Sequence, residues 1–284
     1  MSQIIAVIND KGGVAKTTTA SNLGTALWLL GYKVLLVDTD QQCNLTQVMD
    51  RNSTKPDEDG KCHTLFEWLM DAKDSPINER YNGLDFIPSS RLMANAQREL
   101  VGVSGHEMLL KRRLKLVSDM YDYIIIDSIP GGKNVINTNI LVAADQVIIP
   151  VEADVFSLTG TPNLRSFISE VCENYEKKIQ VLGYLLVKYD AHTRLGKQVK
   201  AFFQSDSPTL CGKLLPVQIR TCQKAKESQG YEQTLFEYAP ESTAADDYMM
   251  LAERLSGCKA RRKTWTPQVW GKKANEAFNN FKNL

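Results

Sequence analysis

Two alternating patterns constrain the fold most strongly: short apolar runs rich in β-branched residues, and longer stretches with helical spacing. The runs have the length of buried parallel strands and lie at residues 3–9, 33–38, 123–127, 146–151 and 179–188. The helical stretches lie at residues 17–30, 104–120 and 157–175, with Gly31 as an expected helix end and Ser157 as an expected N-cap. Strands and helices that alternate in this way form a parallel sheet with helices on both faces. We therefore predict an α/β fold with a mostly parallel β-sheet flanked by helices on both faces.

The composition excludes several other classes of protein. Hydrophobic residues make up 43% of the 284 residues and charged residues 24%, which is typical of globular chains and not of disordered or fibrous ones. The apolar runs are far shorter than the roughly 20 residues of a membrane span, and the start has no secretory signal pattern. The six cysteines form no C-x-x-C pair, so we expect reduced thiols in a cytoplasmic protein. Residues 50–60 are polar and are predicted to be an exposed loop.

A glycine loop lies between the first predicted strand and the first long helix. It reads Asn-Asp-Lys-Gly-Gly-Val-Ala-Lys-Thr-Thr over residues 9–18. A strand, a glycine turn and a Lys-Thr pair that opens a helix place backbone N–H groups and the positive end of the helix dipole around phosphates. Lys16 would then reach the β and γ phosphates, and the Thr17 hydroxyl would bind Mg²⁺. The standard G-x(4)-G-K-[ST] spacing is not met, because Asp10 and Ala15 occupy its glycine positions.

Lys11 makes this loop resemble the deviant Walker A motif of the ParA/MinD family of P-loop ATPases. Three further motifs follow in the family's order: LLVDTDQQCNLT over residues 35–46, YIIIDSIP over residues 123–130, and FEYAPES with AAD over residues 236–246. The resemblance covers residues 3–256, and the ParA/Soj partition branch fits best. It implies a P-loop NTPase domain over residues 1–256, followed by a basic C-terminal extension over residues 257–284, expected to be one amphipathic helix.

The resemblance also implies roles for particular residues. Lys11 would cross a dimer interface to the partner's ATP, and Asp40 would orient the attacking water, so Lys11, Lys16 and Asp40 are the expected catalytic residues. Thr17 and Asp127 would hold Mg²⁺, and Asp38 would fix Thr17 or the outer shell of the metal. The expected nucleotide-binding residues are Lys11, Gly12, Gly13, Val14, Ala15, Lys16, Thr17, Thr18 and, near the adenine, Pro216.

Two departures from the family pattern affect this loop. Ala15 adds a methyl group that is tolerated if its φ is negative. Asp10 should weaken ATP binding unless it faces a cation.

Positive charge is local in this chain, whose net charge is only +1. Residues 188–226 contain eight basic and two acidic residues, and residues 257–284 contain seven basic residues and one acidic residue. Arg194, Lys197 and Lys200 are three apart and share a helical face, and Arg220 and Lys224, with Lys226, form a similar set. Such faces suit sequence-independent contact with the DNA backbone, although a solvated helix face is the alternative. The expected DNA-binding residues are Arg194, Lys197, Arg220 and Lys224.

The predicted function is that of a ParA-like, Mg²⁺-dependent ATPase for plasmid or chromosome partition. It would dimerise with ATP, bind DNA, hydrolyse ATP slowly until a ParB-like partner stimulates it, and associate with the nucleoid in the cytoplasm. The alternative is a MinD-like ATPase that cycles on a membrane through its basic C-terminal extension. That extension could also pack on the domain or add DNA affinity. A nitrogenase-reductase-like electron carrier is disfavoured, because no cysteine closely follows Asp127.

Overall fold

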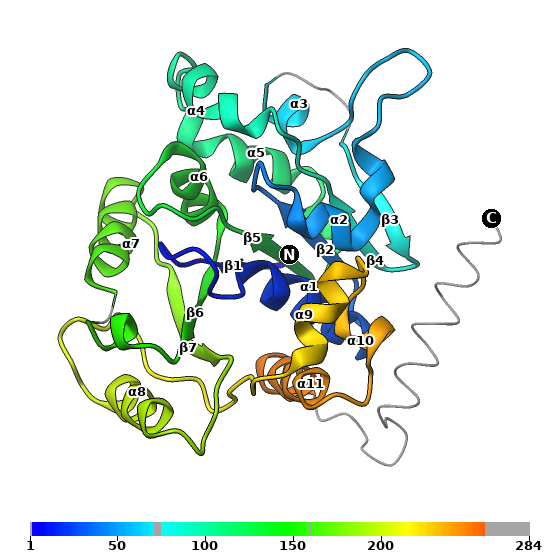
Figure 1. Cartoon of the computed structure of the whole chain (residues 1–284). Coiled ribbons are helices and arrows are strands. Elements are labelled where there is room, and N and C mark those ends of the chain that lie inside the picture. Colours follow the sequence, from blue (N-terminus) through cyan, green and yellow to red (C-terminus); the bar gives the residue numbers. More distant parts are fainter. Residues whose placement is uncertain (1, 71–74, 160, 259–284) are drawn as a thin grey trace.

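The fold is built around one twisted sheet. The computed structural model describes residues 2–70, 75–159 and 161–258, and its sheet has the strand order β3-β4-β2-β5-β1-β6-β7 (Figure 1). The strands are β1 (Gln3–Val7), β2 (Val34–Asp38), β3 (Asn78–Tyr81), β4 (Leu84–Ile87), β5 (Tyr123–Asp127), β6 (Gln146–Glu152) and β7 (Gln180–Val187). All neighbouring pairs are parallel except β3 with β4. The predicted α/β class is confirmed.

Helices cover both faces of the sheet (Figure 1). They are α1 (Lys16–Leu29), α2 (Asn44–Asp50), α3 (Leu65–Met70), α4 (Met93–Val101), α5 (Leu109–Lys115), α6 (Val135–Ala143), α7 (Pro162–Asn174), α8 (Arg194–Gln204), α9 (Gln223–Gly230), α10 (Leu235–Tyr238) and α11 (Thr243–Ser256). Helices α1, α2, α10 and α11 pack on one face, and α3 to α8 pack on the other.

Residue alternation along the central strands produces these two cores. In β1, Ile5 and Val7 pack into the core with α1 and α11, whereas Ala6 lies in the core on the opposite face. Both sets are apolar because each face of a parallel sheet is covered by helices. For this reason the strands read as continuous hydrophobic runs in the sequence.

The register of the central strands brings two carboxylates together. Asp38 at the end of β2 is the direct partner of Asp127 at the end of β5. β1 lies between β5 and β6, so the loop after β1 emerges beside both acidic residues. The carboxyl edge of a parallel sheet is where ligands bind in open α/β folds.

All five predicted strands are present, but two strands were missed. β3 and β4 form a hairpin around Asn82-Gly83, with Gly83 at φ 88°. An Asn-Gly pair between short strands is a strong turn signal, because its backbone adopts positive φ readily. The two strands were not predicted because each has only four residues and includes charged ones, so neither forms an apolar run.

Two predicted helices differ from those in the structure. The stretch 104–120 is divided into two 3-10 turns and the short helix α5. Ser157 was wrong as an N-cap, because α7 begins at Pro162 after Thr161. Proline suits the first helical position, where its missing N–H is not needed. The predicted loop at 50–60 begins on the last residue of α2, continues as a 3-10 turn, Arg51–Thr54, and has no helix or strand over residues 55–60.

The compact part of the chain continues to α11. This helix ends at Ser256, and Gly257 follows it with φ 67°, a conformation that favours glycine. The amphipathic helix predicted in the basic extension lies outside the described residues, which end at 258. Among the helices of the described ranges, none is long and apolar enough to cross a membrane.

Candidate nucleotide site

The loop between β1 and α1 has the backbone shape of a phosphate-binding turn. Gly13 has φ 77° and Ala15 has φ 58°, so both lie in the left-handed region. The condition under which Ala15 was expected to be tolerated, a negative φ, is not met: this alanine occupies a conformation that usually selects glycine. Ala15 is also the N-cap of α1, and no side chain caps the helix there. The first N–H groups of α1 are therefore available to an anion.

Lys16 is the buried cation of this loop. Its residue is 7% exposed, and its ammonium donates to the carbonyl of Lys11 at 2.9 Å. Burial lowers its pKa, while the carboxylates of Asp127, Asp40 and Asp10 oppose that shift. The interaction with Lys16 also supplies the cation that Asp10 was expected to need, since burial raises the pKa of Asp10 and Lys16 lowers it.

Asp127 is the most deeply buried carboxylate beside the loop whose oxygens are not occupied. It is 1% exposed, and no hydrogen bond of standard geometry reaches either carboxylate oxygen in the described part of the chain. Burial, reinforced by Asp38, raises the pKa of Asp127, and the nearby Thr17 hydroxyl and Lys16 partly oppose this. Bare carboxylate oxygens beside the hydroxyl-bearing Thr17 fit a hard cation such as Mg²⁺, which prefers oxygen ligands.

Asp38 is fully buried, but its oxygens are occupied. They accept hydrogen bonds from the N–H of Thr46 at 2.8 Å, the hydroxyl of Thr46 at 2.7 Å and the N–H of Asp40 at 3.0 Å. Burial raises the pKa of Asp38 to about 6, although the bonds from Thr46 lower it. Asp38 thus holds the turn between β2 and α2, and Thr17 is not among its hydrogen-bond partners within the described residues.

A cavity of about 530 Å³ opens beside the loop. Its lining includes loop residues, strand-end residues and residues from α2 and α9: Gly12, Gly13, Ala15, Lys16, Thr17, Thr18, Asp40, Gln42, Asn44, Gln47, Val48, Ser128, Pro130, Lys188, Lys226 and Gln229. The structure therefore brings most of the predicted phosphate residues together with Asp40. Pro216 is exposed and is not among these lining residues; its segment runs along β7, where Leu215 N–H donates to Tyr184.

Comparison with known proteins identifies the family. A family model described as "AAA domain" matches residues 2–181. Sporulation initiation inhibitor protein Soj of Bacillus subtilis is 34% identical over 260 residues, which cover 90% of this chain and 99% of the relative. The chain belongs to the ParA/MinD family of P-loop partition ATPases. Within it, the chromosome-partitioning ATPase Soj of Thermus thermophilus is 31% identical, over 88% of this chain and 94% of the relative.

A solved structure supports the fold and the nature of the ligand. The crystal structure of cobyrinic acid a,c-diamide synthase from Mycobacterium smegmatis, with bound ADP and magnesium, matches with a TM-score of 0.73 and 29% identity. The match covers 90% of this chain and 94% of that protein. A ParA/MinD-type domain thus shares its sheet and helices with a structure that holds a nucleotide and Mg²⁺.

The position of Lys11, the family's signature lysine, differs from that of Lys16. Its ammonium pairs with the carboxylate of Asp154 and lies 5.7 Å from the centre of the Phe156 ring. Its backbone N–H donates to the Asn9 side chain at 3.0 Å. Lys11 is not among the residues that line the cavity of its own chain.

Sequence reasoning missed four residues that this member of the family places at the cavity. Lys188 donates to the carbonyl of Gly13, Lys226 lines the cavity from α9, and Gln229 donates to the Thr18 hydroxyl at 2.5 Å. The Ser128 hydroxyl is buried and has no hydrogen-bond partner in the described ranges. Ser128 follows the predicted strand 123–127 and Lys188 ends the predicted strand 179–188, so the rule that ligands bind at carboxyl strand ends could have found them. The sequence pattern places Lys226 with Arg220 and Lys224, and only the packing of α9 shows that Lys226 lines the cavity.

The predicted DNA-binding residues fall into two groups. Arg220 is paired with Asp247, at 2.7 Å between Nη2 and Oδ1, and Lys224 is paired with Glu227 at 2.8 Å. Arg194 and Lys197 are exposed on α8, and no ion pair of theirs occurs among the described residues. Lys200, from the same predicted face, instead donates to Gln218 at 3.0 Å. The charges of Arg220 and Lys224 are therefore balanced within the chain, and the DNA-binding role of all four residues stays a prediction.

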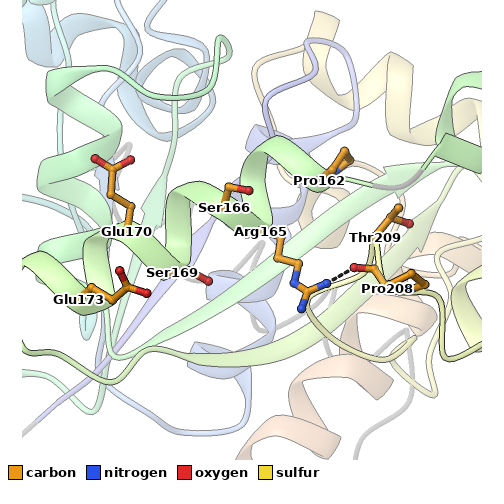
Figure 2. Close-up of a pocket in the computed structure, with 8 residues that line it drawn as sticks. All are labelled: Pro162, Arg165, Ser166, Ser169, Glu170, Glu173, Pro208 and Thr209. Atoms are coloured by element: carbon orange, nitrogen blue, oxygen red, sulfur yellow. Dashed lines mark hydrogen bonds between the residues drawn. The ribbon is translucent and has the colours of Figure 1, made fainter.

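A second hollow lies away from the phosphate loop. Figure 2 shows it between α7 and residues 208–209, where the Arg165 guanidinium donates to the Pro208 carbonyl. The carboxylates of Glu170 and Glu173 line it. Two carboxylates repel phosphate, so this hollow does not compete with the loop as a nucleotide site.

Proposed function

We propose that this chain is a Mg²⁺-dependent ATP hydrolase that acts in DNA partition. One observation supports this most directly: Lys16 and the uncapped start of α1 line one cavity, and the buried carboxylate of Asp127 lies behind them, where it interacts with Thr17 and Lys16. A nucleoside triphosphate requires a cation and free N–H groups for its phosphates, and its metal requires a carboxylate.

The proposed roles follow from this arrangement. Thr17 and Asp127 would hold Mg²⁺, which neutralises charge on the phosphates when it is bound. Lys16 stabilises the transferring phosphoryl group electrostatically. Asp40, half-buried at the cavity, orients the attacking water while its own Oδ1 accepts the N–H of Gln42 at 2.9 Å. Asp38 keeps the turn that carries Asp40 in place.

The partners are proposed from the family. ATP-bound chains would form a homodimer in which Lys11 reaches the partner's nucleotide, as in the ParA/MinD resemblance. The dimer would contact DNA through exposed cations, with Arg194 and Lys197 now favoured over Arg220 and Lys224. A ParB-like protein would stimulate hydrolysis, and DNA binding would place the chain on the nucleoid. We propose that the ATPase domain comprises residues 1–256.

Isothermal titration with ATP and ADP, with and without Mg²⁺, tests the nucleotide site. Lys16→Ala should lose nucleotide binding, because the main phosphate cation is removed. Lys197→Ala, which removes a lysine of the same charge from an exposed helix, should bind nucleotide as the wild type does. Unchanged ATP affinity in Lys16→Ala would refute the site.

DNA and membrane binding are tested separately. DNA affinity should rise with ATP and fall with ADP, and it should weaken steeply with salt. ATP-dependent sedimentation with anionic vesicles, combined with no DNA binding, would favour the membrane-cycling alternative instead.

A further inference from the structure

Lys188 occupies an unusual position at the end of β7. It directly follows Val187 and has φ 50°, in the left-handed region that side chains with a β-carbon rarely adopt. This conformation ends β7 and redirects the chain beside the phosphate loop. Such strain persists only where surrounding contacts hold it, and it is often found at functional sites.

Two contacts hold the Lys188 side chain. Its ammonium donates to the carbonyl of Gly13 at 2.8 Å and to Oε2 of Glu152 at 3.0 Å. Glu152 is the last residue of β6, the neighbour of β7 in the sheet. The carboxylate therefore orients the ammonium, and the ammonium ties the loop to the ends of two strands.

The preceding loop residues Asp10 and Lys11 are already held, because their carbonyls accept from the Gly131 N–H and the Lys16 ammonium, but the two glycines that follow are less restricted. Gly12 and Gly13 are exposed, and a β-carbon at either position would have no neighbouring atom within 4 Å. Two glycines in open space leave the loop many backbone conformations. Because a peptide unit is planar and trans, holding the Gly13 carbonyl also fixes the direction of the Val14 N–H. Loop N–H groups must keep a common direction to bind phosphate.

We propose that Lys188 is a positioning residue for the nucleotide: it pre-orders the Gly13–Val14 peptide of the phosphate loop, with Glu152 holding it in place. This inference rests on the proposed function, since it concerns the same cavity. Lys188 acts on phosphate through the loop backbone. By restricting the loop before ATP binds, it reduces the conformational entropy that the loop loses on binding.

The test compares four variants with the wild type. Lys188→Met keeps the length of the side chain but removes the ammonium, and Lys188→Arg restores a charged donor. Glu152→Gln removes the charge that orients Lys188, and Lys115→Met removes an exposed lysine of α5 as a control. The first readout is amide hydrogen exchange of residues 8–18 in the nucleotide-free protein. The second is ATP affinity by titration.

Lys188→Met should exchange these loop amides faster and bind ATP about tenfold more weakly, as expected for one lost charged hydrogen bond. Lys188→Arg should recover both properties, Lys115→Met should change neither, and the thermal midpoint should stay similar in all. Glu152→Gln should shift both readouts in the same direction as Lys188→Met, by less.

Two results would overturn the inference. Wild-type loop exchange in Lys188→Met would show that the lysine does not order the loop, even if ATP affinity fell. Wild-type ATP affinity in that variant would show that the ordering does not serve the nucleotide. By contrast, a wild type that binds neither ATP nor ADP refutes the proposed function, while exchange in the free protein still reports on the contact between Lys188 and Gly13.

Discussion

The ammonium of Lys11 is paired with the carboxylate of Asp154 inside a single chain. Both side chains are partly exposed, at 40% and 30%, and neither residue lines the nucleotide cavity. The lysine proposed to reach a partner's ATP must therefore exchange Asp154 for a phosphate. In the proposed dimer, Asp154 would compete with the partner's nucleotide for the same cation.

This competition predicts that Asp154→Asn dimerises more readily with ATP than the wild type does. The neutral amide removes the charge that retains Lys11, so less free energy is needed to release it. Lys11→Met should bind ATP as a monomer and fail to dimerise. Sedimentation velocity with ATP, ADP and no nucleotide measures both. A dimer that forms equally well with Lys11→Met would show that Lys11 does not bridge the chains.

Asp40 should be required for hydrolysis and not for ATP binding. Its carboxylate lines the cavity, while the turn that carries it is held mainly by Asp38. Asp40→Ala is expected to reduce hydrolysis by at least about 100-fold, the usual size of a lost acid-base or water-positioning group. ATP affinity should change by less than about tenfold. Phosphate release and titration calorimetry give the two values, and wild-type turnover would exclude Asp40 from this role.

Asp127→Asn should stabilise the nucleotide-free protein at pH 7.5. Burial, with Asp38, raises the pKa of Asp127, so the folded state holds a proton there more tightly than the unfolded chain does. The charged carboxylate thus destabilises the fold at neutral pH, and this effect fades as pH falls through the folded pKa. We expect a gain of about 1 to 2 kcal/mol that shrinks toward pH 5.

Urea unfolding at pH 5.0, 6.0 and 7.5 tests this dependence on Asp127. The same variant should lose Mg²⁺-dependent hydrolysis, because an amide replaces the proposed metal ligand. A variant that is less stable than the wild type at every pH would contradict the assignment of Asp127 as an uncompensated charge.

Arg220 should affect stability, and the helix α8 cations should affect DNA. Asp247 is 5% exposed and accepts hydrogen bonds from both the backbone N–H and the side chain of Arg220. Arg220→Ala leaves this carboxylate short of partners and should cost about 1 to 3 kcal/mol of unfolding free energy. Arg194→Ala and Lys197→Ala should leave stability unchanged.

DNA titration at several salt concentrations completes this comparison. Each of Arg194→Ala and Lys197→Ala should reduce the salt slope of DNA binding by about one unit per subunit. Asp247→Asn with Arg220→Ala serves as the matched control, because it removes the stranded charge. If the double variant lost DNA binding while Arg194→Ala and Lys197→Ala kept it, Arg220 would be the DNA contact and the α8 surface would not be.

The local order of residues was sufficient to predict the central architecture. β1, β2, β5, β6 and β7 were all recognisable, because strands buried on both faces have nearly uninterrupted apolar sequences. The phosphate loop could be predicted equally well, since its chemistry depends on consecutive residues, from Lys11 to Thr18. Asp38 and Asp127 were both placed near the Mg²⁺ site by the family resemblance, and they are neighbours because the carboxyl ends of adjacent parallel strands share one edge.

Only the tertiary structure determined which charges are available. In the sequence, Arg220 and Lys197 are equivalent cations, yet one is neutralised by Asp247 from α11 and the other is exposed on α8. Likewise, Lys11 could not be matched with Asp154, 143 positions away, nor Lys188 with Gly13, 175 positions away. Sequence patterns report periodicity and local geometry, whereas a charge pair depends on how distant segments pack. The fold and the phosphate loop of this protein can therefore be predicted from local sequence. Which of its candidate phosphate-binding and DNA-binding cations are ion-paired depends on how distant segments pack.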